Sequence, residues 1–174
     1  MTPLRLSRGR IAAFYATLIG AGLVVASAAD IWPLRLVYNA SASVPLGFYA
    51  VRDAPELAAG DLVIAHPPLR AEQMLIERRY LGVGVPLVKQ IGAVPGSIVC
   101  RDADRITIDG TPAAVARDAD GLGRALPRWS GCRQLGPGEV FLLNSGVPGS
   151  FDGRYFGPSP ARDIIGKATP LWTW

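Results

Sequence analysis

Residues 85–100 read VPLVKQIGAVPGSIVC, an apolar stretch punctuated by proline and glycine. Short apolar runs of the same kind recur after Pro33 at residues 44–51, 60–68, 105–110, 139–144 and 164–172. With twenty glycines and fifteen prolines between and within such runs, short β-strands are favoured over packed helices. We therefore predict an all-β sandwich or barrel.

Two segments depart from this strand pattern. Residues 68–81, PLRAEQMLIERRYL, place Ala71, Leu75 and Ile76 at helical spacing, which predicts one short helix. Residues 111–130 carry several aspartates and glycines with little periodicity. We predict that they form a long surface loop.

An apolar segment precedes the β region: residues 11–29 read IAAFYATLIGAGLVVASAA, nineteen residues without a charge. At ~1.5 Å rise per residue, such a helix nearly spans a ~30 Å hydrocarbon core. It has no polar face, which argues against a buried amphipathic helix. A cleavable secretory signal is the alternative, because residues 26–28 are Ala-Ser-Ala, although the run exceeds the usual ~7–15 residues. We predict a transmembrane anchor over residues 11–32.

The flanks of this anchor predict its orientation. Three arginines precede the apolar run, and an aspartate and a tryptophan follow it: Arg5, Arg8, Arg10, Asp30 and Trp32. Positive charge favours the cytoplasmic side, and tryptophan favours the membrane–water interface. We therefore expect residues 1–10 in the cytoplasm and residues 33–174 as one folded domain outside it.

Composition argues against two classes of function. The net charge of +4 is concentrated before the anchor, and no basic stripe interleaved with aromatics follows, so we expect no nucleic-acid partner. Two cysteines and the single histidine, His66, cannot complete a tetrahedral metal site without carboxylates. We expect no metal and no cofactor.

The cysteines, Cys100 and Cys132, are even in number and belong to a domain expected outside the reducing cytoplasm. One structural disulfide is therefore predicted, which could tether the 111–130 loop. The chain-entropy model gives it roughly 3–4 kcal/mol of stabilisation.

Candidate bases for hydrolytic chemistry are few. His66 lies in IAHPP, where a strand end or turn is the expected setting, and the only lysines are Lys89 and Lys167. Lys89 lies in the apolar segment GVGVPLVKQIGAV, where desolvation would lower its pKa toward the range of a general base. The alternative is an edge-strand lysine that faces water.

A candidate nucleophile follows the anchor by about ten residues. Residues 39–49 read NASASVPLGFY, so Ser43 is expected near the outer membrane–water boundary. Taken alone, a serine in such a turn is an ordinary loop residue.

Residues 41–45, Ser-Ala-Ser-Val-Pro, resemble the nucleophile box of the type I signal peptidases. Four further boxes of that family follow in order: Gly-Asp-Leu-Val at 60–63, Lys-Gln-Ile-Gly-Ala-Val-Pro-Gly at 89–96, Ser-Phe-Asp-Gly-Arg-Tyr-Phe-Gly at 150–157 and Ile-Gly-Lys-Ala at 165–168. Gly153 stands where the family has a second serine. The resemblance implies the all-β signal-peptidase fold, behind one N-terminal transmembrane helix, with an extended substrate added as a strand beside the sheet.

The resemblance also implies a serine endopeptidase in which Ser43 is the nucleophile and Lys89 the neutral general base. Ser41 would donate to the oxyanion beside the backbone N–H of Ser43, and donors of this kind contribute about 10²–10³-fold. Ser150 would orient the lysine amine. Asp152 and Arg154 would form a supporting ion pair, for which the alternative is an ordinary surface turn pair.

The variant Ser-Val-Pro-Leu-Gly-Phe-Tyr at residues 43–49 is similar to the conjugative transfer signal peptidases (TraF). That likeness implies a domain in the periplasm, anchored in the inner membrane, that matures a pilin precursor for conjugation and type IV secretion. The acyl-enzyme could be resolved by water or by the pilin's own amino terminus. Two alternatives stay open: a general signal peptidase for secretory preproteins, and a non-catalytic membrane-tethered β scaffold of the pilus assembly.

Overall fold

The computed structural model describes residues 8–28 and 34–174, in two compact units, Met1–Leu34 and Arg35–Trp174. The first unit contains one helix, α1 (Arg8–Ala28). Residues 8–26 of this helix are long and apolar enough to cross a membrane, as the uncharged run predicts. The predicted flanking roles of Arg5, Asp30 and Trp32 lie outside the described residues.

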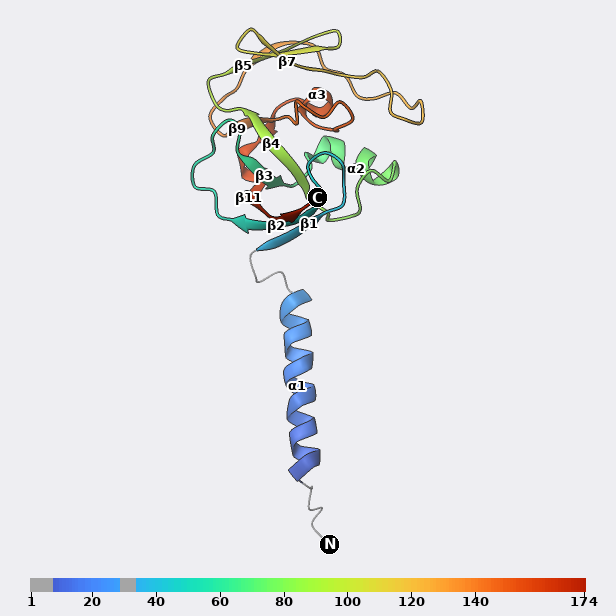
Figure 1. Ribbon diagram of the computed structural model, residues 1–174, viewed down its shortest axis with the longest axis vertical. Coiled ribbons are helices and arrows are strands. Elements are labelled where there is room, and N and C mark those ends of the chain that lie inside the picture. The colour runs from blue at the N-terminus through green and yellow to red at the C-terminus, as the bar shows by residue number, and fades with distance from the viewer. Residues whose placement is uncertain (1–7, 29–33) are drawn as a thin grey trace. The chain divides into compact units, whose positions relative to one another are not determined.

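The second unit is built from two antiparallel sheets (Figure 1). The seven-stranded sheet, in the order β1-β2-β11-β3-β4-β9-β10, contains β1 (Leu36–Asn39), β2 (Gly47–Arg52), β3 (Leu62–Ala65), β4 (Leu87–Ala93), β9 (Glu139–Leu142), β10 (Ser159–Pro160) and β11 (Ile164–Thr173). The four-stranded sheet, in the order β7-β6-β5-β8, contains β5 (Ile98–Asp102), β6 (Arg105–Ile108), β7 (Thr111–Val115) and β8 (Gly131–Gln134). The all-β prediction is confirmed.

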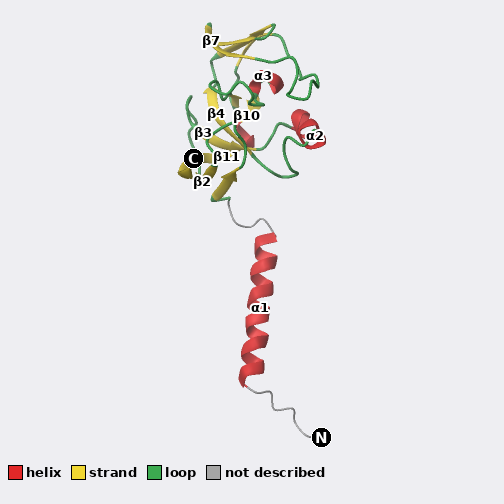
Figure 2. Ribbon diagram, turned by 45° about the vertical axis from the view of Figure 1, so that its right-hand side comes forward, coloured by secondary structure: helices red, strands yellow, loops and turns green. Residues whose placement is uncertain are grey.

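Three short helices complete this unit: α2 (Leu69–Glu77), α3 (Gly153–Phe156) and the 3₁₀ helix η1 (Ala161–Asp163). Figure 2 shows α2 and α3 as the short red helices beside the yellow strands. The helix predicted within residues 68–81 is therefore confirmed. Ala71 and Leu75 are the buried residues of α2.

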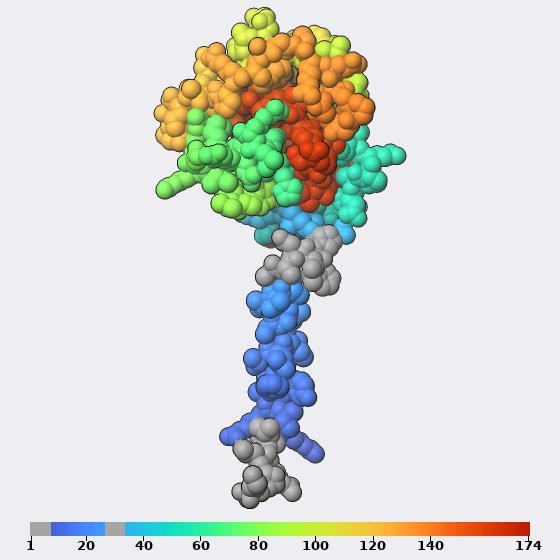
Figure 3. Space-filling view, turned by 180° about the vertical axis from the view of Figure 1, so that it is seen from behind, coloured from blue at the N-terminus to red at the C-terminus, as the bar shows by residue number. Residues whose placement is uncertain are grey.

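The core consists of three apolar clusters that share the large sheet. One packs α2 against β3, β4 and β9, and includes Leu75, Leu87, Ile91, Leu142 and Phe156. On the face seen in Figure 3, the green segment that carries α2 lies against the red-orange C-terminal segment. The second cluster joins β4 and β9 to the small sheet, and the third lies among β2, β3, β4 and β11. Strand β4 contributes to all three, so its side chains are largely withdrawn from water.

One prediction is wrong in part. Residues 111–130 are not loop throughout, because Thr111–Val115 form β7, which pairs with β6. As an edge strand with mostly exposed or half-buried side chains, β7 has no apolar alternation to reveal it. The same reason explains why the sequence did not predict β8, whose four residues are all exposed.

Cys100 of β5 and Cys132 of β8 occupy facing positions in the small sheet. Their sulfur atoms are 2.07 Å apart, at disulfide-bonding distance, as the even cysteine count predicts. The pair fastens edge strand β8 to β5 and so fixes the end of the 111–130 segment.

Candidate active site

Lys89 lies in the middle of β4, between β3 and β9, and only 3% of the residue is exposed. Because side chains alternate across a strand, Lys89 shares a face with Leu87 and Ile91, which both pack in the α2 cluster. Burial lowers the pKa of its amine from 10.5 to about 8, while the charge of Asp152 raises it and that of Arg154 lowers it further. The alternative of an edge-strand lysine facing water is therefore wrong.

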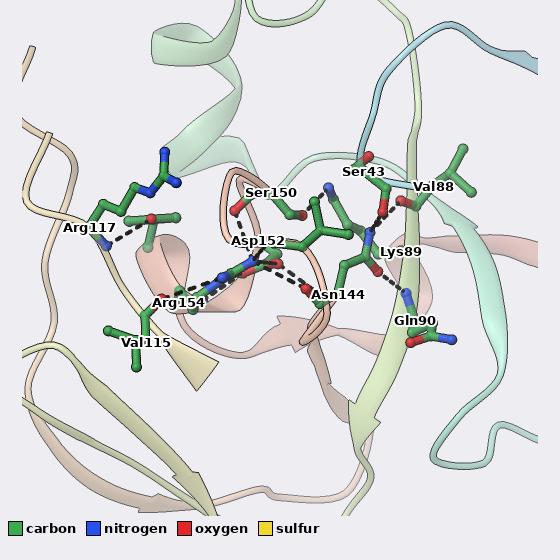
Figure 4. A network of polar contacts seen from close by, with 12 residues as sticks. Ser43, Val88, Lys89, Gln90, Val115, Arg117, Asn144, Ser150, Asp152 and Arg154 are labelled. Carbon is green, nitrogen blue, oxygen red and sulfur yellow. Dashed lines mark hydrogen bonds and ion pairs between the residues drawn. The ribbon is translucent and has the colours of Figure 1, made fainter. Parts of the chain in front are cut away.

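Ser150 contacts this amine directly. Lys89 Nζ donates a hydrogen bond of 2.8 Å to Ser150 Oγ. Ser150 is 2% exposed and lies in the turn between β9 and α3. Figure 4 shows its side chain directed toward Lys89. The structure thus brings together residues from two different family boxes, one on β4 and one in the turn after β9, the strand that pairs with β4.

Asp152 and Arg154 form a buried, bidentate ion pair. Arg154 Nε lies 2.9 Å from Asp152 Oδ1, and its Nη2 lies 2.8 Å from Oδ2. Their side chains are 0% and 1% exposed, which excludes a surface turn pair. Arg154 Nη2 also donates to the carbonyls of Val147 and Ser150, at 2.7 and 3.2 Å. The pair is therefore hydrogen-bonded to the backbone of the turn that carries Ser150 and holds that turn in place.

The glycine that departs from the family box has a steric cause. A Cβ atom built on Gly153 would lie 2.7 Å from both the Leu142 carbonyl oxygen and the Phe141 ring. The Gly153 carbonyl accepts a hydrogen bond from Trp129 Nε1 at 2.9 Å. Because the backbone packs this closely at the start of α3, a serine does not fit here without displacement.

The loop that carries Ser43 is shaped by Asn39, the last residue of β1, which is 5% exposed. Its amide nitrogen donates to three carbonyls, those of Ser41, Val44 and Pro45, at 2.8–3.1 Å. Its side-chain oxygen accepts from the Ser41 hydroxyl at 2.8 Å. Ser41 Oγ also lies 2.9 Å from Ser43 Oγ. Because the Ser41 hydroxyl donates its hydrogen bond to Asn39, its oxygen accepts one from the Ser43 hydroxyl.

Ser41, Ser43, Lys89 and Ser150 line one cavity of about 600 Å³. Its remaining wall is largely apolar and includes Leu75, Leu81, Val85, Leu87, Leu126 and Phe151. Among the described residues no hydrogen bond joins Ser43 Oγ to Lys89 Nζ, since Ser43 bonds to Ser41 and Lys89 bonds to Ser150. Catalytic hydrogen bonds are often loose before substrate binds, so a shared cavity suits a nucleophile and its base.

The other candidate bases lie elsewhere. His66 directly follows β3, and its backbone N–H donates to the Asp163 carbonyl at 2.8 Å, which confirms the predicted strand-end setting. Lys167 Nζ forms a half-exposed ion pair with Asp61 at 2.8 Å. Neither residue lines the cavity of Ser43.

Three features of the site have no counterpart in the sequence prediction. Two are the asparagines Asn39 and Asn144, whose side chains bond to backbone groups within six positions and across the sheet, respectively. Neither kind of contact leaves a periodic signal. The third is a cavity wall from the 117–126 segment, where Asp120 accepts hydrogen bonds from the Tyr80 hydroxyl and from Arg124. The hydrogen bond from Tyr80 is the main reason why the pKa of Asp120 is lowered. For Asn144 the sequence does offer one signal: it is a polar residue that directly follows the apolar run EVFLL, as site residues at strand ends often do.

The family model described as "Signal peptidase, peptidase S26" matches residues 9–174. The chain belongs to the signal peptidase family, peptidase S26. Within this peptidase family it is similar to the conjugal transfer protein TraF of Agrobacterium fabrum (strain C58), with 38% identity over 147 residues, 78% of this chain and 81% of that protein. A plasmid transfer protein TraF of Escherichia coli is 32% identical over 171 residues, 90% of this chain and 96% of that protein.

These matches confirm the resemblance to the TraF proteins inferred from residues 43–49. A solved signal peptidase I of Enterococcus faecalis V583 is 19% identical, with a TM-score of 0.38, and covers 66% of this chain and 98% of its own.

Proposed function

We propose that this chain is a membrane-anchored serine endopeptidase that uses Ser43 and Lys89 to mature a pilin precursor for conjugal transfer. The observation that carries the proposal is the buried amine of Lys89, with its pKa lowered to about 8, in the cavity that Ser43 also lines. Such an amine is neutral often enough near pH 7–8 to act as a general base.

In the proposed reaction, Ser43 Oγ attacks the scissile carbonyl and its proton passes to Lys89 Nζ. When the tetrahedral intermediate collapses, the peptide C–N bond breaks and the protonated lysine returns that proton to the leaving amine. The acyl-enzyme then holds the substrate as an ester on Ser43. Attack by water gives a linear product, and attack by an amino terminus gives a new peptide bond.

Oxyanion stabilisation would come from the Ser43 backbone N–H and the Ser41 hydroxyl. In this structure Ser41 Oγ donates to Asn39 Oδ1, so the hydroxyl must rotate away from Asn39 to reach the oxyanion. Its adjacency to Ser43 Oγ, at 2.9 Å, supports the role.

The substrate would enter as an extended segment along β1. This strand is at the edge of the large sheet, and its residues Val37 and Tyr38 line the cavity, so an added strand would lead toward Ser43. The apolar cavity wall suits apolar side chains on the substrate.

The proposed location is the inner membrane, with residues 1–10 in the cytoplasm and residues 33–174 in the periplasm. An exposed aromatic cluster supports a membrane-facing surface on the folded unit. Its rings, 37–71% exposed, are in contact in the order Phe48, Tyr38, Trp174 and Trp172, with neighbouring centroids 5.0–6.3 Å apart. Tyrosine and tryptophan are the residues that favour the membrane–water interface.

The direct test is the intact mass of a conjugative pilin precursor co-expressed with the full chain. We expect wild type to shorten the precursor and Ser43→Ala and Lys89→Ala to leave it intact, while Lys167→Ala is the matched lysine control that retains activity. A product lighter by one water than the cut linear chain would identify cyclisation. Processing that survives in both Ser43→Ala and Lys89→Ala would contradict the proposal and favour a non-catalytic scaffold. Cleavage of unrelated secretory precursors by the wild-type chain would favour a general signal peptidase.

A further inference from the structure

Asn144 lies at the centre of the polar network in Figure 4. It follows β9 by two positions and is 3% exposed. Its side-chain nitrogen donates to the Ser43 carbonyl at 2.7 Å and, more weakly, to the Val88 carbonyl at 3.5 Å. Its side-chain oxygen accepts from the Gln90 backbone N–H at 2.8 Å. One buried amide therefore bonds to the nucleophile's own peptide unit and to both neighbours of Lys89.

An asparagine side chain suits these three partners because it offers two N–H donors and a carbonyl acceptor. The two carbonyls require donors and the Gln90 N–H requires an acceptor, so the amide orientation is defined by its surroundings. An aspartate of the same shape would present oxygen to the Ser43 and Val88 carbonyls and lose both donations.

The backbone of Asn144 makes a separate set of bonds. Its N–H donates to Asp152 Oδ2 at 3.1 Å, and its carbonyl accepts from Arg154 Nη2 at 3.3 Å. These bonds do not depend on the side chain, so a substitution at this position leaves the attachment to the buried ion pair in place. A side-chain variant therefore isolates the connection between the Ser43 loop and β4.

That connection bears on catalysis, because Ser43 and Lys89 come from different segments and bond to different partners in this structure. Because no hydrogen bond joins Ser43 to Lys89 among the described residues, other contacts must fix the distance between the two side chains. We propose that Asn144 is a positioning residue that sets the placement of Ser43 relative to Lys89, an inference that rests on the proposed peptidase function.

The test compares the full chain in detergent with Asn144→Asp, Asn144→Ala and a destabilised control, Leu135→Ala, in the core beside the small sheet. The substrate is the pilin precursor, and kcat, KM and their pH profiles are measured below the melting temperature of every variant. A displacement of about 1 Å in a reacting group can cost ~100-fold, so we expect kcat to fall ~100-fold in both Asn144 variants with KM nearly unchanged.

The pH profile separates an effect of charge on Lys89 from an effect of position, because only one of the two Asn144 variants adds a charge. In Asn144→Asp the added carboxylate beside β4 favours the protonated lysine, so the rising limb of kcat/KM shifts to higher pH. In Asn144→Ala no such shift is expected, and Leu135→Ala should lower the melting temperature with kcat and pH profile unchanged.

If wild type shows no Ser43- and Lys89-dependent cleavage, the proposed function fails and the inference falls with it. If wild type cleaves but the Asn144 variants keep kcat within ~3-fold, or lose it only as Leu135→Ala does at equal stability, the inference alone is overturned.

Discussion

Lys89 Nζ and Ser150 Oγ, sixty-one positions apart in sequence, lie 2.8 Å apart in the buried half of the cavity that Ser43 lines. Among the described residues, Ser150 is the hydrogen-bond partner of this amine, so the contact orients it. It gives Ser150 a defined role in the proposed reaction, because a neutral lysine can accept the Ser43 proton only when its lone pair faces the cavity.

Replacing Ser150 by alanine should therefore lower kcat more than it raises KM. The amine stays buried but loses the hydroxyl that orients it, and loss of one orienting hydrogen bond in general-base catalysis is expected to cost about 10²-fold. Steady-state kinetics on the pilin precursor checks this. Ser97→Ala, outside the cavity lining, is the matched control. An unchanged kcat in Ser150→Ala would show that the contact is not used.

The pKa of Lys89 predicts the pH dependence of cleavage. Below about pH 8 the amine is mainly protonated in the folded protein, and only its neutral fraction can act as a base. The value of kcat/KM should therefore rise about tenfold per pH unit and level off above pH 8. The sign follows from burial, which lowers the lysine pKa and so extends activity downward in pH. A profile that is flat between about pH 6 and pH 8 would argue against a lysine base.

The Asp152–Arg154 pair predicts a stability effect. Asp152→Asn removes one partner and leaves the Arg154 charge buried, which typically costs about 3–5 kcal/mol. Thermal unfolding of the variant should show a large drop in the melting temperature. Asp118→Asn, which weakens an exposed pair with Arg128, should change it little. Equal effects from the two variants would mean that the buried pair contributes no more than a surface pair.

Gly153 predicts a second stability effect, at the position where the chain departs from the family box. Gly153→Ser would place a Cβ atom 2.7 Å from the Leu142 carbonyl oxygen and should cost about 1–3 kcal/mol. Gly146→Ser is the matched control, since its Cβ would meet no atom within 4 Å. Unfolding by denaturant compares them. A Gly153→Ser variant as stable as the control would show that the backbone here can move aside at little cost.

Apolar runs and helical spacing predict the strands of the core and the short helix, and the family boxes predict the candidate site residues. Lys89 was recognisable because a charged residue inside an apolar strand needs a reason to be there. The roles of Asn39 and Asn144 lie in hydrogen bonds to backbone groups, which depend on chain geometry and not on the partner's side chain. Only for Asn144 does the sequence offer a signal, its position directly after a buried apolar run. The sequence could not reveal that Asp152 and Arg154 are buried, since two charged residues in a Gly-rich segment are more typical of a surface turn.

The edge strands β1, β7 and β8 were missed for a related reason. Their residues are largely exposed or half-buried, so the alternation that marks a strand against a core is absent. The disulfide-distance pair Cys100 and Cys132 was predictable from the cysteine count and the expected compartment, but its placement across two neighbouring strands was not.

In the proposed reaction Ser43 forms a covalent acyl-enzyme with Lys89 as its base, and intact-protein mass spectrometry after rapid acid quench can detect that intermediate. With the pilin precursor present, wild type should gain the mass of the acyl segment, and peptide mapping should place the adduct on Ser43. Ser43→Ala and Lys89→Ala should show no adduct and no cleavage. Precursor cut by wild type and Ser43→Ala at equal rates, with no adduct on either, would show that Ser43 is not the nucleophile.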